Sequence, residues 1–178
     1  MPIEIVFETH SISEDNERDT ATGWLPGRLS ERGRQLAAEL GERRRNDGLA
    51  AVFTSDSTRA AETASVAFPH GEIDILHDWR LRECDYGHDN GMPASQLHAN
   101  RTHYIDQPYP GGESWRQAVD RVGRFLSDLP LRWSDTRILV IGHVSTKWGL
   151  DHFIDGKSVA ELEAADFGWR EGWEYRLI

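Results

Sequence analysis

The sequence has little cysteine, no long apolar run and no concentration of basic residues. Cys84 is the only cysteine among 178 residues, which excludes an internal disulfide and is typical of a reducing compartment. The apolar stretches at 49–53 and 138–141 are far too short to cross a membrane. Residues 1–10 lack the basic-then-apolar order of a signal peptide. We therefore expect a cytoplasmic protein with no membrane partner.

The charge balance is acidic, with a formal net charge of -10. The densest basic run, Arg43 to Arg45, falls at the end of a predicted helix, where cations interact favourably with the helix dipole. Because no basic stripe is present to neutralise a polynucleotide backbone, a nucleic-acid partner is not expected. A small phosphorylated molecule is still compatible with this composition if a few cations converge in one cleft.

Short apolar segments alternate with amphipathic ones along the chain. The pattern predicts strands at 2–7, 50–54, 73–76, 137–141 and 174–178, the last at a sheet edge. It predicts helices at 30–45, from a cap at Ser55 or Asp56 to residue 67, and at 114–129, 142–154 and 158–164. We find no repeat or linker, and the length suits one domain over residues 1–178. The alternation indicates an α/β fold: a three-layer α/β/α sandwich with a mostly parallel sheet.

Two segments lack clear periodicity. Residues 8–29 form a polar loop, and a loop of that length in a small domain is usually functional. Residues 79–110 are interpreted as an insertion over one end of the sheet that covers the active site. Its aromatic and histidine side chains are candidates for the walls of a substrate pocket, although they suit packing or surface positions equally well: Trp79, Tyr86, His88, His98, His103 and Tyr104.

Two histidines and a serine directly follow predicted strands. His10, Ser55 and His143 should meet at one edge of the sheet, because ligands collect at the carboxyl ends of parallel strands. A neutral imidazole at position 10 can attack phosphorus and form a phosphoramidate. His143 falls at a helix N-terminus, where backbone N–H groups favour an anion. One such histidine is more often structural, so the pair is the informative feature.

An arginine and a glutamate complete a set that can act on a phosphate ester. The guanidinium of Arg59 fits phosphate oxygens in a bidentate manner, although pairing with Glu62 on a helix surface is an equally supported interpretation. Glu83 can protonate a leaving alkoxide, whereas taken alone it is better explained as a solvated glutamate. The eight histidines show no zinc-ligand spacing, so no metal is expected.

Several short motifs occur in an order that points to one family. Asn16 and Gly23 follow His10, and the further motifs are GWLPGRLSERGRQLA, which begins at Gly23, then TSDSTRAAETA, LRECDYGHDNG, GGES and IGHVS. Through these motifs the chain resembles the histidine phosphatase superfamily, which includes phosphoglycerate mutases and small broad phosphatases. The resemblance covers nearly the whole chain and implies a phosphoglycerate mutase-like fold. Each motif alone is weak, and their shared order makes the resemblance strong.

The resemblance implies specific roles. His10 is the residue expected to become phosphorylated, while Arg59 and His143 are expected to hold phosphate oxygens. Glu83 is expected to donate a proton to the leaving group and then to activate water. Asn16 is expected to contact the phosphate or the substrate. No cofactor is implied, because cationic side chains take the place of a metal.

The chain departs from the family at the nucleophile. The usual Arg-His-Gly is replaced by Thr9, His10 and Ser11, and losing one charge-assisted contact costs about 1.5–3 kcal/mol if nothing replaces it. If that contact strengthens in the transition state, the rate falls roughly 10–100-fold. The usual glycines after the second histidine are also replaced. The phosphate-binding or substrate-binding residues expected around His10, with two compensating cations among them, are Thr9, Ser11, Asn16, Arg18, Val144 and Lys147.

We expect a metal-independent phosphatase that hydrolyses a small phosphate monoester through a phosphohistidine on His10. One alternative is a non-catalytic or weakly active phosphate-binding relative, supported by Thr9 and opposed by the retention of Glu83. Another alternative is a phosphoryl-transferring mutase, although mutases of this family are longer and have a larger insertion. The substrate itself cannot be inferred from the sequence, and exposed edge strands are compatible with a homodimer.

Overall fold

The computed structural model describes residues 2–178. Its centre is a five-stranded sheet in the order β3-β2-β4-β1-β5. The first four strands in this order run parallel, and only β5 is antiparallel to its neighbour β1. In chain order the strands are β1 (Ile3–Thr9), β2 (Ala51–Thr54), β3 (Ile75–His77), β4 (Arg137–Gly142) and β5 (Trp173–Leu177).

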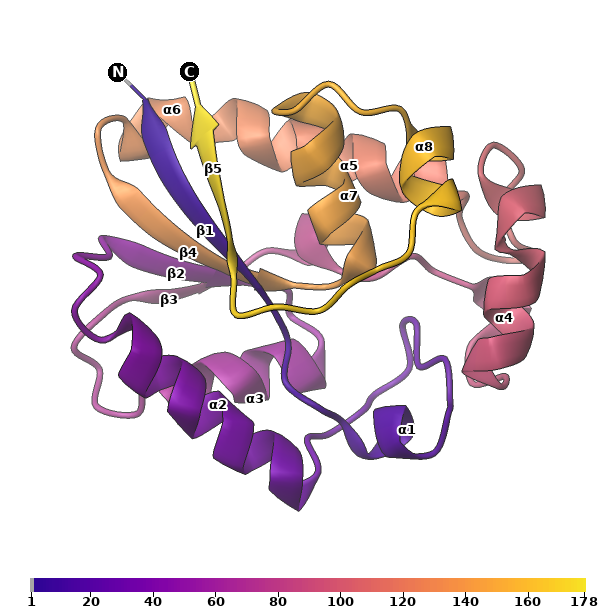
Figure 1. Cartoon of the computed structure of the whole chain (residues 1–178), viewed down its shortest axis with the longest axis horizontal. Helices are drawn as coiled ribbons and strands as arrows, with labels where there is room; N and C mark the ends of the chain where they lie inside the picture. Colours follow the sequence, from indigo (N-terminus) through magenta and orange to yellow (C-terminus); the bar gives the residue numbers. More distant parts are fainter. Residues whose placement is uncertain (1) are drawn as a thin grey trace.

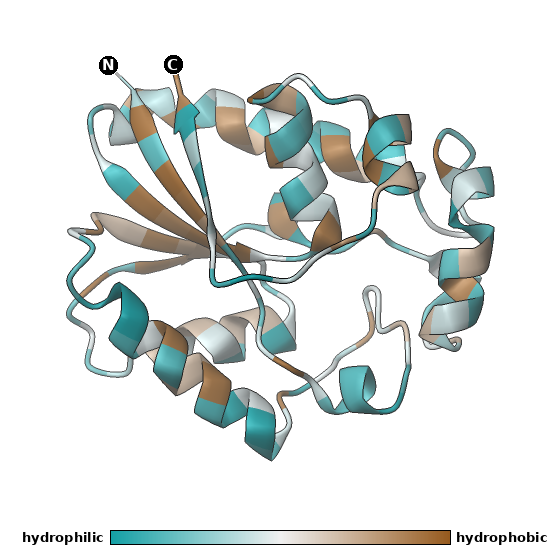
Figure 2. Cartoon of the chain, in the orientation of Figure 1, coloured by the Kyte–Doolittle hydropathy of each residue, from teal (hydrophilic) through white to brown (hydrophobic). Residues whose placement is uncertain are grey.

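Helices cover both faces of this sheet (Figure 1). On one face lie α2 (Glu31–Arg44) and α3 (Thr58–Ala67), and on the other lie α5 (Trp115–Asp128) and α7 (Val144–Phe153). The predicted three-layer α/β/α sandwich with a mostly parallel sheet is therefore confirmed. Figure 2 shows hydrophobic residues concentrated along the strands, with hydrophilic residues on the outer sides of the helices.

Successive side chains of β1 point to opposite faces of the sheet and pack in the hydrophobic clusters on each face. Ile5 and Phe7 pack in a cluster with Val122 of α5 and Leu150 of α7, whereas Val6 packs in a cluster on the side of α2 and α3. This alternation follows from the two-residue period of a strand that is buried on both faces.

Short helices complete the chain. They are α1 (Glu14–Glu17), η1 (Trp79–Leu81), η2 (Gly87–Asp89), α4 (Ala94–Asn100), η3 (Arg101–Tyr104), α6 (Pro130–Trp133) and α8 (Val159–Ala164). Of these, α8 matches the predicted helix at 158–164, and all the others except α6 lie within the two segments without periodicity. One or two turns are too short to produce a readable amphipathic pattern, which explains why residues 8–29 and 79–110 resembled loops. Within residues 2–178, no helix has the length and hydrophobicity needed to span a membrane.

The expected cap of α3 is wrong. Ser57, rather than Ser55 or Asp56, precedes the helix, and its side chain makes no capping hydrogen bond. Its hydroxyl instead contacts Ser55 Oγ at 2.8 Å and His143 Nε2 at 3.2 Å. Both serines after β2 thus face the sheet edge, where the strand ends meet.

Candidate active site

The carboxyl ends of β1 and β4 bring two histidines together. Thr9 pairs with Gly142 in the parallel register, and the backbone N–H of His10 donates to the Gly142 carbonyl at 2.9 Å. His10 and His143, one residue past each strand, therefore have ring centroids 5.0 Å apart. This proximity confirms the predicted meeting of the strand ends.

His10 is held as a neutral imidazole with its Nε2 lone pair available. Its Nδ1 lies 2.7 Å from the Ser11 carbonyl oxygen. Because that oxygen can only accept, Nδ1 carries the proton and Nε2 is unprotonated. Burial and then the nearby positive charge of Arg59 lower the pKa of His10 to about 3. At neutral pH, Nε2 is consequently free to act as a nucleophile.

His143 is buried behind His10 in the opposite tautomer. Its Nδ1 lies 3.4 Å from Nη2 of Arg59, which can only donate. The proton therefore sits on Nε2 and is donated to Ser55 Oγ at 2.7 Å. Burial, followed by the charges of Arg59 and His10, lowers the pKa of His143 well below its usual value.

Arg59 is 3% exposed and incompletely bonded. One guanidinium nitrogen, Nη2, donates to the Gly23 carbonyl at 3.0 Å, whereas the buried Nη1 has no hydrogen-bond partner among residues 2–178. The alternative surface pairing with Glu62 does not occur, since Glu62 pairs with Arg34 at 2.8 Å. Leaving a buried donor unsatisfied costs about 1–3 kcal/mol, and more for a charged group. An anion placed beside Nη1 would remove that cost.

Glu83 is oriented by two backbone donors. Its Oε1 accepts from the N–H of Cys84 at 2.9 Å and from the N–H of Ser145 at 3.2 Å. Glu83 is buried, with only 9% of its surface exposed. Within the described chain no donor engages Oε2, so one carboxyl oxygen is left for proton transfer.

A buried arginine that the sequence interpretation missed supports Glu83. Arg121 of α5 is 1% exposed. Its Nη1 donates to the Arg80 and Arg82 carbonyls at 2.8 and 2.7 Å, and its Nη2 donates to the Glu83 carbonyl at 2.8 Å. The same nitrogen pairs with Glu113 at 2.5 Å. Arg121 therefore clamps the irregular segment that carries Glu83.

Residues of α7 bind the same segment from another side. Ser145 Oγ donates to the Arg82 carbonyl at 2.9 Å, and Thr146 Oγ1 donates to the Leu81 carbonyl at 2.8 Å. The carbonyls of residues 80–83 lack a sheet or helix partner, so buried side chains have to satisfy them. The helix that begins after His143 thus also fixes the backbone before Glu83.

A cavity of about 500 Å³ is lined in part by His10. Its lining also includes four of the predicted phosphate-binding residues: Thr9, Ser11, Asn16 and Val144. Within this group, Asn16 Oδ1 accepts from Ser13 N and Ser13 Oγ at 2.9 Å each, which fixes the amide orientation. None of the proposed wall residues of 79–110 lines this cavity.

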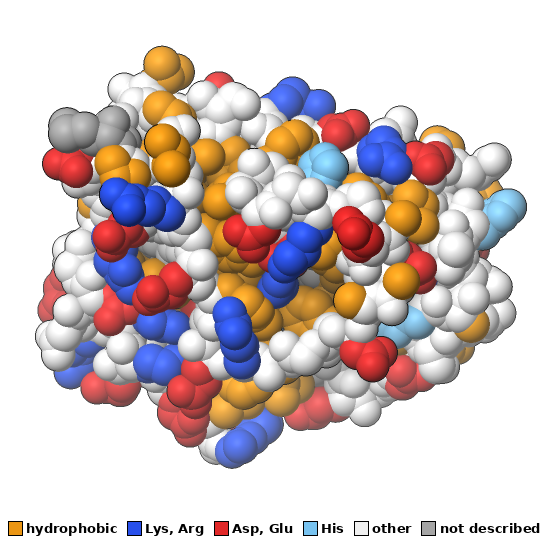
Figure 3. Space-filling model, turned by 45° about the horizontal axis from the view of Figure 1, so that its top comes forward, with side chains coloured by type: hydrophobic (Ala, Val, Ile, Leu, Met, Phe, Trp, Pro, Cys, Tyr) orange, Lys and Arg blue, Asp and Glu red, His pale blue; other side chains and the backbone are white. Residues whose placement is uncertain are grey.

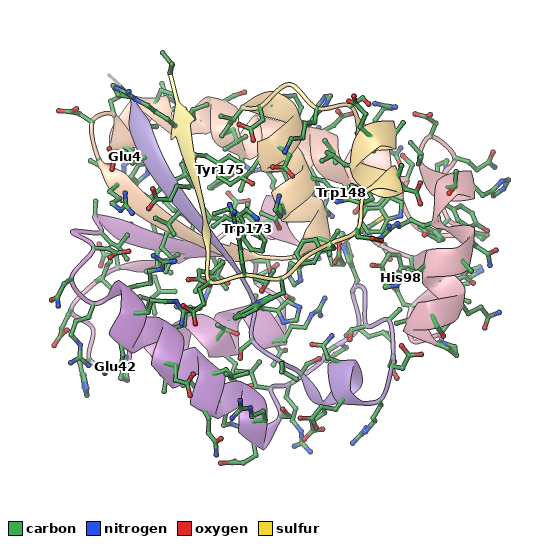
Figure 4. All side chains as sticks on the ribbon, viewed as in Figure 1. Glu4, Glu42, His98, Trp148, Trp173 and Tyr175 are labelled. Atoms are coloured by element: carbon green, nitrogen blue, oxygen red, sulfur yellow. The ribbon has the colours of Figure 1, made fainter. Side chains whose placement is uncertain are left out.

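The two cations expected to compensate for Thr9 are not brought to His10. Arg18 has a side chain 69% exposed and lies 3.7 Å from Glu14. Lys147 pairs with Asp151 at 2.6 Å, and its Nζ lies 5.1 Å from the ring centroid of Trp173, which is labelled in Figure 4. Neither residue lines the cavity.

Two other arginines do line the cavity. Arg43 shares the carboxylate of Glu8 with Arg44, at 3.3 and 2.8 Å. Arg32, in the first turn of α2, has no ion pair within the part of the chain that the structure describes. Figure 3 shows acidic and basic side chains intermixed over one face, with hydrophobic atoms visible between them. Arg32 therefore adds a cation without an ion pair to the cavity that His10 also lines.

Among residues 2–178, no three His, Cys, Asp or Glu side chains gather into a group that could hold a metal ion. The expectation that no metal or cofactor takes part stays a prediction. The cations near His10 are guanidinium groups, which bind phosphate oxygens through fixed pairs of donors.

Comparisons with known proteins point to one family. A sequence profile of the histidine phosphatase superfamily (branch 1) matches residues 5–167. The chain is 32% identical over 159 residues to a 2,3-bisphosphoglycerate-dependent phosphoglycerate mutase of Parvibaculum lavamentivorans, covering 80% of this chain and 75% of that mutase.

Solved structures share the fold. YhfR of Bacillus stearothermophilus superposes with a TM-score of 0.83 at 24% identity, covering 95% of this chain and 88% of that one. A mycobacterial glucosyl-3-phosphoglycerate phosphatase complexed with VO3 superposes with a TM-score of 0.81 at 23% identity, covering 92% and 87%. At such identities the likeness shows the fold alone.

Proposed function

Because the chain belongs to the histidine phosphatase superfamily, we propose that it hydrolyses a small phosphate monoester through a phosphohistidine on His10. Nε2 of His10 attacks phosphorus and the bond from phosphorus to the ester oxygen breaks, while Glu83 gives its proton to that oxygen. Glu83 then takes a proton from water, the water oxygen attacks phosphorus, and the bond to Nε2 breaks. Inorganic phosphate leaves and His10 returns to its neutral form.

The observation that carries this proposal is the buried, unpartnered Nη1 of Arg59 in a site that also holds two neutral histidines. The site contains a nucleophile and unsatisfied positive charge, and a phosphoryl group supplies the anionic oxygens that this charge lacks. A bound phosphate also raises the pKa of His143, because a nearby negative charge favours the imidazolium form. His143 then becomes a second donor to phosphate oxygen.

A phosphoryl-transferring mutase is the second candidate, favoured by the 32% identity to the Parvibaculum lavamentivorans mutase. A mutase has to return the phosphoryl group to its product before water reaches the phosphohistidine. His10 lines an open cavity of about 500 Å³, which supports access of water and therefore hydrolysis. A non-catalytic binder is disfavoured because the free Oε2 of Glu83 has no evident purpose in binding alone.

The test is a panel of phosphate monoesters, with released phosphate measured for the natural chain and for His10→Ala. We expect phosphate release from at least one ester and its loss in His10→Ala. Turnover of 3-phosphoglycerate to its 2-phospho isomer faster than phosphate release would favour the mutase. No turnover of any ester, together with unchanged behaviour of His10→Ala, contradicts both enzymatic functions.

A further inference from the structure

The cavity beside His10 has largely apolar walls. It lies between α2 and residues 167–171, which precede β5, so it is separate from the segment that carries Glu83. Its hydrophobic lining comes from Ile12, Leu36, Leu40, Val144, Phe167 and Trp169. Pockets of this volume with a few polar groups at one end are typical of small-molecule sites.

Exposed hydrophobic side chains converge in this cavity. Ile12, Phe167 and Trp169 are 36%, 39% and 62% exposed, and all three line it. Large apolar side chains that share one exposed patch favour a ligand that removes them from water. Two of the three are aromatic, which favours a planar aromatic ligand group through stacking.

Trp169 is anchored beside the nucleophile by the residue that replaces the family's arginine. Its indole Nε1 donates to Thr9 Oγ1 at 3.2 Å. An arginine at position 9 has donors only and cannot accept this bond. Thr9 and Trp169 therefore form a matched pair, and the wall next to His10 is aromatic where an arginine would make it cationic.

The charges around the cavity disfavour a second anionic group on the substrate. Three carboxylates line it, from Glu8, Glu39 and Glu171, against the two guanidinium groups of Arg32 and Arg43. Arg43 contacts two of these carboxylates, Glu8 at 3.3 Å and Glu171 at 4.0 Å, and Glu8 also pairs with Arg44 at 2.8 Å. Of the two arginines that line the cavity, only Arg32 has no ion pair with a described residue, and one exposed cation is a weak partner for an additional carboxylate or phosphate.

We propose that this cavity binds the organic group of the substrate and selects an aromatic ring stacked on Trp169, in a monoester without a second anionic group. This inference rests on the proposed phosphatase function. Since Glu83 does not line the cavity, the ester oxygen and the ring lie apart. A 2-arylethyl phosphate is the probe of this arrangement, because its two-carbon linker separates the ring from the ester oxygen.

The test compares kcat/KM for 2-phenylethyl phosphate, 2-hydroxyethyl phosphate and 3-phosphoglycerate, which all release alkoxides. We expect the phenylethyl ester to be preferred at least ~10-fold, from burial of the ring at about 25 cal/mol per Å². Trp169→Ala should reduce this preference to below ~3-fold, because the remaining apolar walls bury less of the ring. Leu131→Ala, at an 82% exposed position on α6, is the control and should keep the preference.

Thr9→Arg should shift the preference toward 3-phosphoglycerate, since it restores a cation and removes the acceptor of Trp169. Equal kcat/KM for all three esters, or a preference that Trp169→Ala leaves intact, overturns the inference while the phosphatase function stands. If no ester is turned over, calorimetry compares the affinities of 2-phenylethylphosphonate and ethylphosphonate and so measures binding in the cavity without turnover. Tighter binding of the phenyl compound supports the subsite, and equal binding overturns it.

Discussion

Arg121→Met tests whether a side chain outside the reaction centre controls proton transfer. The substitution keeps an unbranched apolar stem and removes the guanidinium that bonds three carbonyls and Glu113. Removing one partner of a buried ion pair costs about 3–5 kcal/mol. Since the unfolding free energy of a domain is about 5–15 kcal/mol, most of the protein should stay folded at low temperature. Arg124→Met, an exposed arginine on the same helix, is the matched control.

The catalytic effect should depend on the leaving group. An alkoxide needs the proton of Glu83, whereas p-nitrophenolate leaves without it. Misplacing a catalytic group costs up to about 100-fold, so we expect kcat/KM for an alkyl phosphate to fall ~10–100-fold. For p-nitrophenyl phosphate we expect a loss below about threefold. The ratio kcat/KM is the correct readout, because it reports phosphoryl transfer to His10 and excludes later hydrolysis.

Urea unfolding measures the first effect, and steady-state kinetics with the two ester classes measure the second. Arg121→Lys keeps a charge but has fewer and differently placed donors, so its leaving-group effect should lie between those of the natural chain and Arg121→Met. Two results would refute the reasoning. One is a loss of stability no larger than that of Arg124→Met. The other is an equal fall of kcat/KM for alkyl and p-nitrophenyl esters.

Three further predictions concern the cations and His10. Arg59→Met should lower kcat roughly 10²–10³-fold, the size expected when a hydrogen-bond donor to developing negative charge is lost. The Tm of this variant should not fall, because the substitution removes a buried unsatisfied donor. A large drop in Tm would contradict this expectation. Because the pKa of His10 is about 3 in the folded chain, below its unfolded value near 6.5, the unfolded chain binds more protons between these values. The unfolding free energy should therefore decrease as pH falls through that range, and His10→Gln should weaken the decrease in urea titrations at several pH values. Arg32→Ala should raise KM roughly 2–5-fold, the size expected of an exposed ion contact, whereas Arg45→Ala, at the C-cap of α2 and outside the cavity, should leave KM unchanged.

The sequence predicts the fold correctly where helices and strands are long and buried. Within β4, residues 138–141 form an unbroken buried apolar run, because parallel strands are covered on both faces. The caps at Ser30, Ser114 and Ser158 accept from the backbone as their residue type predicts. The predicted cap of α3 was wrong because the hydroxyls of Ser55 and Ser57 contact His143, and such tertiary contacts override the local preference for capping.

The sequence predicts the site residues that directly follow a strand. It predicts far fewer of those whose position depends on tertiary packing. His10 and His143 are adjacent because parallel strands end at one edge. Arg121 showed one usable signal, since it falls on the apolar face of α5 between Ala118 and Phe125, where an arginine needs buried partners. Arg32 showed none, because its role depends on which face of α2 borders the cavity.

The most direct test of the central claim is to trap the covalent intermediate. The protein is mixed with a turned-over phosphate ester and quenched in alkaline denaturant, which preserves phosphohistidine, and the phosphorylated nitrogen is identified by peptide mass spectrometry and phosphorus NMR. We predict one phosphoryl group on Nε2 of His10, because Nδ1 is bonded to the Ser11 carbonyl, and none in His10→Gln. Phosphate release without labelling of His10, or labelling on Nδ1 or another residue, would contradict it.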